Sequence, residues 1–125
     1  TGTDEEIVAQ GQEEVNQGFR PELKPLGFDP EEYDTVIVGT PTWWYTMASP
    51  VLSFLSRVDW RGKTLIPFQT HAGWPGHCLE DMRQICQGAR VLCPKKIHFS
   101  PKQFGRVETP RQELEQWLTQ LKTLV

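Results

Sequence analysis

Continuous apolar runs predict three short strands along the chain. Residues 35–40 (TVIVGT) and 62–70 (GKTLIPFQT) are apolar at consecutive positions, which is typical of strands covered on both faces. A third run covers residues 90–94 (RVLCP), and residues 95–99 (KKIHF) are a candidate extension of it. Pro67 lies inside the second run and has no N–H to donate, so we expect a local irregularity of the sheet there.

Helical spacing of apolar residues marks four further segments. Residues 4–18 carry only a thin apolar stripe, so this helix should pack loosely. Residues 49–60 and 78–88 have stronger core faces, and a last helix is expected to begin with Thr109 as its cap and Pro110 in its first turn. Residues 19–32 contain three prolines and a glycine, which favours a connector.

The alternation of helices with buried strands predicts one α/β domain over residues 1–125. A parallel sheet of about three strands, with helices on both faces, satisfies this order. Ligands of such sheets bind just beyond the carboxyl ends of the strands. The loops TPTWWYTM and THAGWPGH both follow carboxyl ends of predicted strands, so they should approach the same edge of the sheet.

Composition narrows the classes of partner. The net charge of −3 gives no support to a nucleic-acid partner, and no run of about 20 apolar residues predicts a membrane span. The three cysteines lack paired spacing, which favours reduced thiols in the cytoplasm over a disulfide framework. No spacing of His and Cys predicts a metal site, and no arrangement of acids, bases and nucleophiles predicts a catalytic centre.

The segment YDTVIVGTPTWWYTMASPVLSFLSRVDWRGKTLIPFQTHAGWPG resembles the flavodoxin family. In that family a strand ending G-x-P-x-W-W leads to one wall of a flavin site. A second strand, opened by Gly-Lys and closed by Thr and a Gly-rich loop, leads to the other wall. The resemblance covers roughly residues 5–122 and implies a flavodoxin-like fold, FMN as cofactor, and electron transfer or reduction of a small acceptor.

The resemblance also implies which residues would hold the flavin ring. One wall would comprise Thr40, Pro41, Thr42, Trp43 and Trp44, and the other Thr70, His71, Ala72, Gly73 and Trp74. His71 has two open interpretations: it bonds a ring edge, or it is a polar loop residue that faces water. Trp60 and Trp117 are expected to be core residues.

The sequence departs from the family pattern at its start. Flavodoxins begin with a strand and a loop rich in Ser, Thr and Gly that holds the FMN phosphate, and no such segment precedes residue 35. The opening TGTDEE is a weak substitute, because no strand leads into it. Without the family's first two strands, the strand at 35–40 should have an open edge that invites pairing with another chain.

Three alternatives follow from this departure. In the first, the chain is a truncated flavodoxin-like product, incomplete at its N-terminus, and the missing piece is supplied from elsewhere. In the second, the strand at 35–40 pairs edge to edge with a second copy in a homodimer. In the third, the chain is a shortened paralogue that no longer binds FMN, a flavin-free module of flavodoxin fold that acts as a dimer or partner-binding domain.

Overall fold

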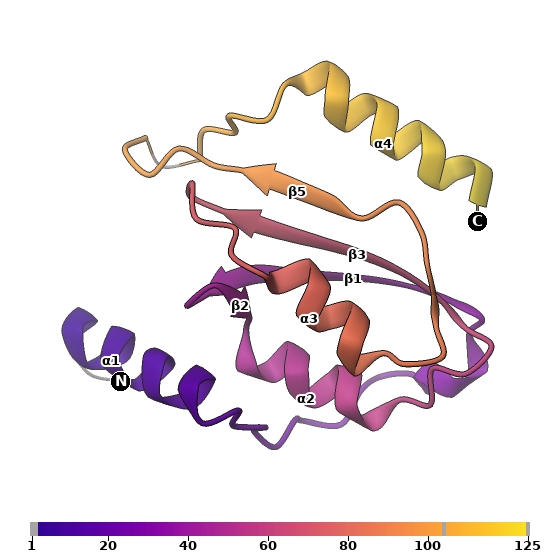
Figure 1. Cartoon of the computed structure of the whole chain (residues 1–125), viewed down its shortest axis with the longest axis horizontal. Coiled ribbons are helices and arrows are strands. Elements are labelled where there is room, and N and C mark those ends of the chain that lie inside the picture. The colour runs from indigo at the N-terminus through magenta and orange to yellow at the C-terminus, as the bar shows by residue number, and fades with distance from the viewer. Residues whose placement is uncertain (1–2, 104, 125) are drawn as a thin grey trace.

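A parallel sheet forms the centre of the protein, as the sequence predicts. The computed structural model describes residues 3–103 and 105–124. The sheet order is β2-β1-β3-β4, with β5 also paired to β3 beyond β4. Figure 1 shows β3 between β1 and β5. β3 pairs in parallel with β1, β4 and β5, whereas the short β2 runs antiparallel to β1. The strands are β1 (Thr35–Trp43), β2 (Thr46–Met47), β3 (Thr64–His71), β4 (Arg90–Val91) and β5 (Lys95–His98).

Helices cover the sheet from both sides, so the predicted α/β architecture is confirmed. α2 and α3 lie on one face and α4 on the other (Figure 1). α1 has no buried residue, which confirms the expectation of a loosely packed helix. The helices are α1 (Asp4–Asn16), the 3-10 turn η1 (Pro30–Glu32), α2 (Ser49–Arg57), α3 (Cys78–Ile85) and α4 (Arg111–Leu124). Within the described residues, none of these helices is long and apolar enough to cross a membrane.

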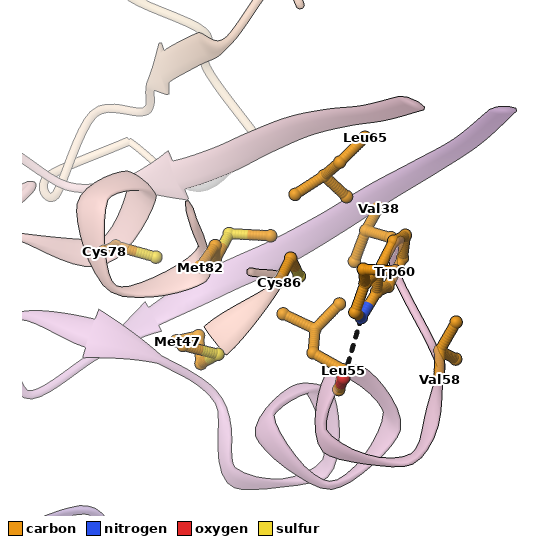
Figure 2. Close-up of a cluster of buried hydrophobic side chains, with 9 residues drawn as sticks. All are labelled: Val38, Met47, Leu55, Val58, Trp60, Leu65, Cys78, Met82 and Cys86. Carbon is orange, nitrogen blue, oxygen red and sulfur yellow. Dashed lines mark hydrogen bonds between the residues drawn. The ribbon is translucent and has the colours of Figure 1, made fainter. Parts of the chain in front are cut away.

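The main hydrophobic core lies between the sheet and the pair α2–α3. Trp60 is only 2% exposed there, and its indole N–H donates a 2.8 Å hydrogen bond to the carbonyl of Leu55 (Figure 2). Cys78 and Cys86 are buried in the same cluster as free thiols. Burial raises the pKa of each of these thiols to about 12, so neither is a reactive thiolate at neutral pH.

The irregularity expected at Pro67 occurs in the neighbouring strand. Leu65 pairs with Val91 and Phe68 pairs with Lys95, so two residues of β3 face three residues between β4 and β5. The N–H of Leu92 bonds the carbonyl of Leu65, and alternation turns the backbone of Pro67 to the same side. The chain therefore bulges where proline offers no donor, and the third predicted strand is split into β4 and β5.

The bulge also anchors the last helix. Cys93 lies in the bulge with a φ of 47°, and its carbonyl accepts a 2.8 Å hydrogen bond from the indole N–H of Trp117 in α4. Trp117 packs edge-on against Phe68 and joins Ile66 and Leu121 in a second buried cluster. The prediction that Trp117 is a core residue is confirmed, since it is 8% exposed.

The outer edge of β1 is bare over most of its length. β1 meets β2 only at Thr42 and Trp43, and no other described strand pairs with that edge. Thr64 donates its N–H to the carbonyl of Asp34, so alternation turns the backbone groups of Thr35, Ile37 and Gly39 away from β3. The Ile37 side chain is 45% exposed, because α4 covers β3 and the bulge rather than β1.

Candidate functional site

The β1–β3 ladder brings the two sequence-predicted loops together. Its last pair is Pro41 with Thr70, so both loops leave the sheet at the same edge. Just beyond that pair, the hydroxyl of Thr42 donates a 2.8 Å hydrogen bond to the carbonyl of Thr70. The expectation that both loops approach one edge of the sheet is therefore met by the structure.

Two aromatic residues form the tip of the first loop in an unfavourable backbone conformation. Trp44 and Tyr45 are the two-residue turn between β1 and β2, with φ values of 49° and 70°. Such a turn normally holds Asn and Gly, because both central residues need positive φ. Large side chains there cost roughly 1–3 kcal/mol each, and strain of this kind concentrates at functional sites. The aromatic pair is thus held outward against its local preference.

The second loop braces this turn. The N–H of His77 donates to the carbonyl of Tyr45 at 2.8 Å. Gly76 has a φ of +56°, and a Cβ there would lie 2.3 Å from the same carbonyl oxygen. Only glycine fits so close to the Tyr45 backbone, so the two loops are in direct contact.

The remaining residues predicted for the first wall have distinct settings. Thr40 is 2% exposed, and its hydroxyl donates to the carbonyl of Pro41 and accepts from the N–H of Ala48. The buried Thr40 side chain therefore stabilises the backbone of the loop and does not face the slot. Pro41 is exposed, whereas Thr42 and Trp43 are half-buried.

The second wall starts with a half-buried histidine. Thr70 and His71 end β3, and Ala72, Gly73 and Trp74 are exposed, with Trp74 at 64%. His71 Nδ1 accepts a 3.1 Å hydrogen bond from the N–H of Gly73. The His71 ring stacks on that of His98 in β5, with centroids 4.9 Å apart and an interplanar angle of 9°. Burial, followed by the charges of His98 and Lys96, lowers the pKa of His71.

The walls meet in an aromatic slot, which we define by Thr42, Trp44, Tyr45 and Trp74. The slot has a volume of about 200 Å³. A groove of about 430 Å³ adjoins it on the other side of Trp44, between the first loop and α1. The groove is lined by Ile7, Val8, Gly11, Thr42, Trp43 and Trp44.

Sequence reasoning missed several residues around these hollows. Tyr45 and the α1 residues of the groove were not assigned to a wall, although the unusual WWY triplet signalled the former. Asp81 was also missed: its Oδ2 accepts a 2.5 Å hydrogen bond from Thr46 and contacts His77 Nδ1. Thr46, His77 and Asp81 line a further hollow of about 380 Å³, which Trp44 also lines.

The geometry of the slot suits a flat aromatic ligand, but residues 3–103 and 105–124 form no cradle for its phosphate. Indole and phenol faces offer stacking surfaces, and the exposed residues Ala72 and Gly73 offer backbone groups for ring edges, apart from the Gly73 N–H that bonds His71. At the start of α1, the Thr3 hydroxyl already accepts from the N–H of Glu6, and Asp4 and Glu5 add negative charge. Thr1 and Gly2 of the TGTDEE segment lie outside the described residues.

A family model for flavodoxins matches residues 9–121. The chain belongs to the flavodoxin family. A comparison with curated proteins finds no match. A flavoprotein from Lactobacillus acidophilus, solved in complex with FMN, is similar with a TM-score of 0.63 and 19% identity over 94% of this chain and 72% of that one.

Two candidate flavoproteins from Bacteroides are also similar to this flavodoxin-family chain. The protein from Bacteroides uniformis has a TM-score of 0.68 and 23% identity, and that from Bacteroides eggerthii has 0.66 and 22%. Each match covers 88% of this chain, which spans 66% and 65% of the two proteins, respectively. At these identities the structural likeness establishes the fold alone.

The His71–Gly73 contact predicts a pH-sensitive loop. The folded pKa of His71 lies below the ordinary value of 6.5 that applies to the unfolded chain. As the pH falls, the unfolded chain therefore binds a proton at His71 before the folded chain does. The contribution of His71 to the free energy of unfolding is highest above pH 6.5 and decreases as the pH falls from 6.5 through the folded pKa. A protonated Nδ1 also cannot accept the Gly73 N–H, so that bond should break.

We expect the Gly73 amide signal in NMR to follow the His71 titration at a pH below 6.5. In His71→Asn the amide oxygen can still accept, and the Gly73 signal should lose its pH dependence. A His71 imidazole that titrates at or above its ordinary value, with no response at Gly73, would contradict this account of the loop.

Proposed function

We propose that the chain binds the isoalloxazine ring of FMN between its two loops, and that it carries electrons or takes part in reducing a small acceptor. The observation that carries the proposal is the aromatic slot itself, which lies at the carboxyl ends of two neighbouring parallel strands. The flavodoxin-family match and the relative solved with FMN support this choice of ligand.

The residues of the slot would bind and orient the ring. Trp44 and Trp74 supply flat apolar faces, while the strained turn holds Trp44 toward the hollow. The backbone groups of Ala72 and the carbonyl of Gly73 would bond the polar ring edges. The Thr70 carbonyl, the His71 carbonyl and the Gly73 N–H already bond Thr42, Phe99 and the His71 ring, respectively. A bound flavin supplies the electron-transfer chemistry, so the protein's part is to shield the ring and set its environment.

The slot accounts for binding of the flavin ring, whereas the FMN phosphate has no matching site among the described residues. Apart from the two walls of the slot, the described part of the chain presents no Ser/Thr/Gly loop at the carboxyl edge of the sheet, and the α1 N-terminus is acidic and capped by its own residues. We therefore expect riboflavin and FMN to bind with comparable affinity.

A titration with each flavin, followed by quenching of flavin fluorescence, tests the proposal. Trp44→Ala should weaken binding by about tenfold, because it removes one stacking face of the slot. Phe28→Ala is the matched control, since Phe28 is a 53% exposed aromatic in the connector and its removal should leave the affinity unchanged. Absence of quenching with both flavins would contradict the proposal.

A second function is favoured by the bare edge of β1: a module that associates through a strand added at residues 35–41. The unpaired backbone of Thr35, Ile37 and Gly39 provides the hydrogen bonds, and exposed Ile37 provides apolar contact. The added strand would come from a second copy or from another segment.

Light scattering after size exclusion tests the second-copy form of this function. The chain should have a dimer mass, and Ile37→Lys should shift it to a monomer because a lysine on an edge strand opposes pairing. Val107→Lys places the same charge at a 41% exposed site away from β1 and should leave the mass unchanged. A monomer at every concentration would contradict pairing between copies.

A further inference from the structure

One buried side chain joins both loops of the slot. Gln69 is fully buried, and its Nε2 donates to the Thr42 hydroxyl at 2.8 Å and to the Pro75 carbonyl at 3.0 Å. Thr42 lines the slot, and Pro75 directly follows Trp74. These two bonds connect the first loop to the second beyond the last pair of the β1–β3 ladder.

The orientation of the Gln69 amide follows from its partners. The Thr42 hydrogen is donated to the carbonyl of Thr70, so the Thr42 oxygen can only accept from Gln69. The Pro75 carbonyl is also only an acceptor. Both contacts therefore require the NH₂ group, and a flipped amide would set its oxygen against two acceptors.

This orientation leaves a buried acceptor unsatisfied. Gln69 Oε1 has no hydrogen-bond partner among the described residues, although it is shielded from solvent. Buried polar groups without partners are rare because they cost stability. The amide therefore holds the two loops together at a cost, which is typical of a side chain placed for a function rather than for the core.

We infer that Gln69 is a positioning residue that sets the spacing between the Trp44 and Trp74 walls, acting through Thr42 and Pro75. The inference rests on the proposed function, because the spacing becomes useful when a flat ring lies between the walls. Thr42 donates its only O–H to the Thr70 carbonyl while it accepts from Gln69, so its side chain offers the ligand no donor.

Gln69→Glu is the most direct test, because it keeps the shape and removes both donors. An ionised carboxylate would face two acceptor oxygens, whereas the protonated acid regains one O–H donor. Burial raises the pKa of such a carboxyl group, which brings its titration toward neutral pH. We expect riboflavin affinity to fall about tenfold at pH 8 and to recover partly toward pH 6.

The pH dependence of riboflavin affinity should have opposite directions in Gln69→Glu and in the natural chain. In the natural chain, protonation of His71 should loosen the second loop, so riboflavin affinity should be constant or fall as the pH decreases. Gln69→Glu should show the opposite trend. Thr42→Val should lose affinity at every pH, because valine has no hydroxyl to accept from Gln69 Nε2. Equal affinity and equal pH dependence in the natural chain, Gln69→Glu and Thr42→Val would overturn the inference.

A measurement without flavin separates this inference from the proposed function. Gln69→Met is uncharged and of similar volume, so it should fold while lacking the bridge. With fluorotryptophan, the ¹⁹F signals of Trp44 and Trp74 should broaden or split in Gln69→Met, and those of Trp60 and Trp117 should not.

The ¹⁹F result stands whether or not the chain binds flavin. If the natural chain binds neither flavin, the proposed function fails, and altered Trp44 and Trp74 signals would still support the bridge. Unchanged signals at both tryptophans in Gln69→Met would overturn the positioning role even if flavin binds.

Discussion

The parallel register between β1 and β3 is the constraint on which the rest of the site depends. It ends with Pro41 opposite Thr70, so the strand residues that follow, Thr42 and His71, lie at the same level just before the two loops. Side-chain hydrogen bonds hold the two segments together beyond the last ladder pair. The Thr42 hydroxyl bonds the Thr70 carbonyl, and the Gln69 amide bonds the Pro75 carbonyl.

Local preferences are violated where this register ends. Trp44 and Tyr45 occupy positive φ values that favour Asn or Gly, and the Gln69 oxygen is buried without a partner among the described residues. The contacts from His77 and Gly76 to the Tyr45 backbone hold the turn in place. Backbone strain and an unsatisfied acceptor thus occur around one aromatic slot, whereas the buried cluster formed around Trp60 and Leu65 is apolar packing.

The sequence was sufficient to predict the fold class because the relevant signals are local. Buried strands appear as continuous apolar runs, and the order of helices and strands selects a parallel sheet. Pro67 even located the irregularity. Its consequence, the bond from Trp117 to the Cys93 carbonyl, could not be predicted because it joins residues that are far apart in the sequence.

The site was predicted less completely for the same physical reason. The two loops were found from their place after strands and from their aromatic residues. Gln69 looks like an ordinary strand residue, and its importance comes from Thr42, which lies 27 positions earlier. Nothing in the local pattern shows that Trp44 and Tyr45 form a two-residue turn, since that turn rarely contains such side chains.

The most direct test of the aromatic slot is an NMR spectrum of the five tryptophan indole N–H groups during addition of riboflavin. The indole N–H groups of Trp60 and Trp117 are bonded within the fold and serve as internal controls. We predict that the Trp44 and Trp74 signals move while these two stay in place. Unmoved Trp44 and Trp74 signals, or equal movement of all five, would contradict a flavin site between the two loops.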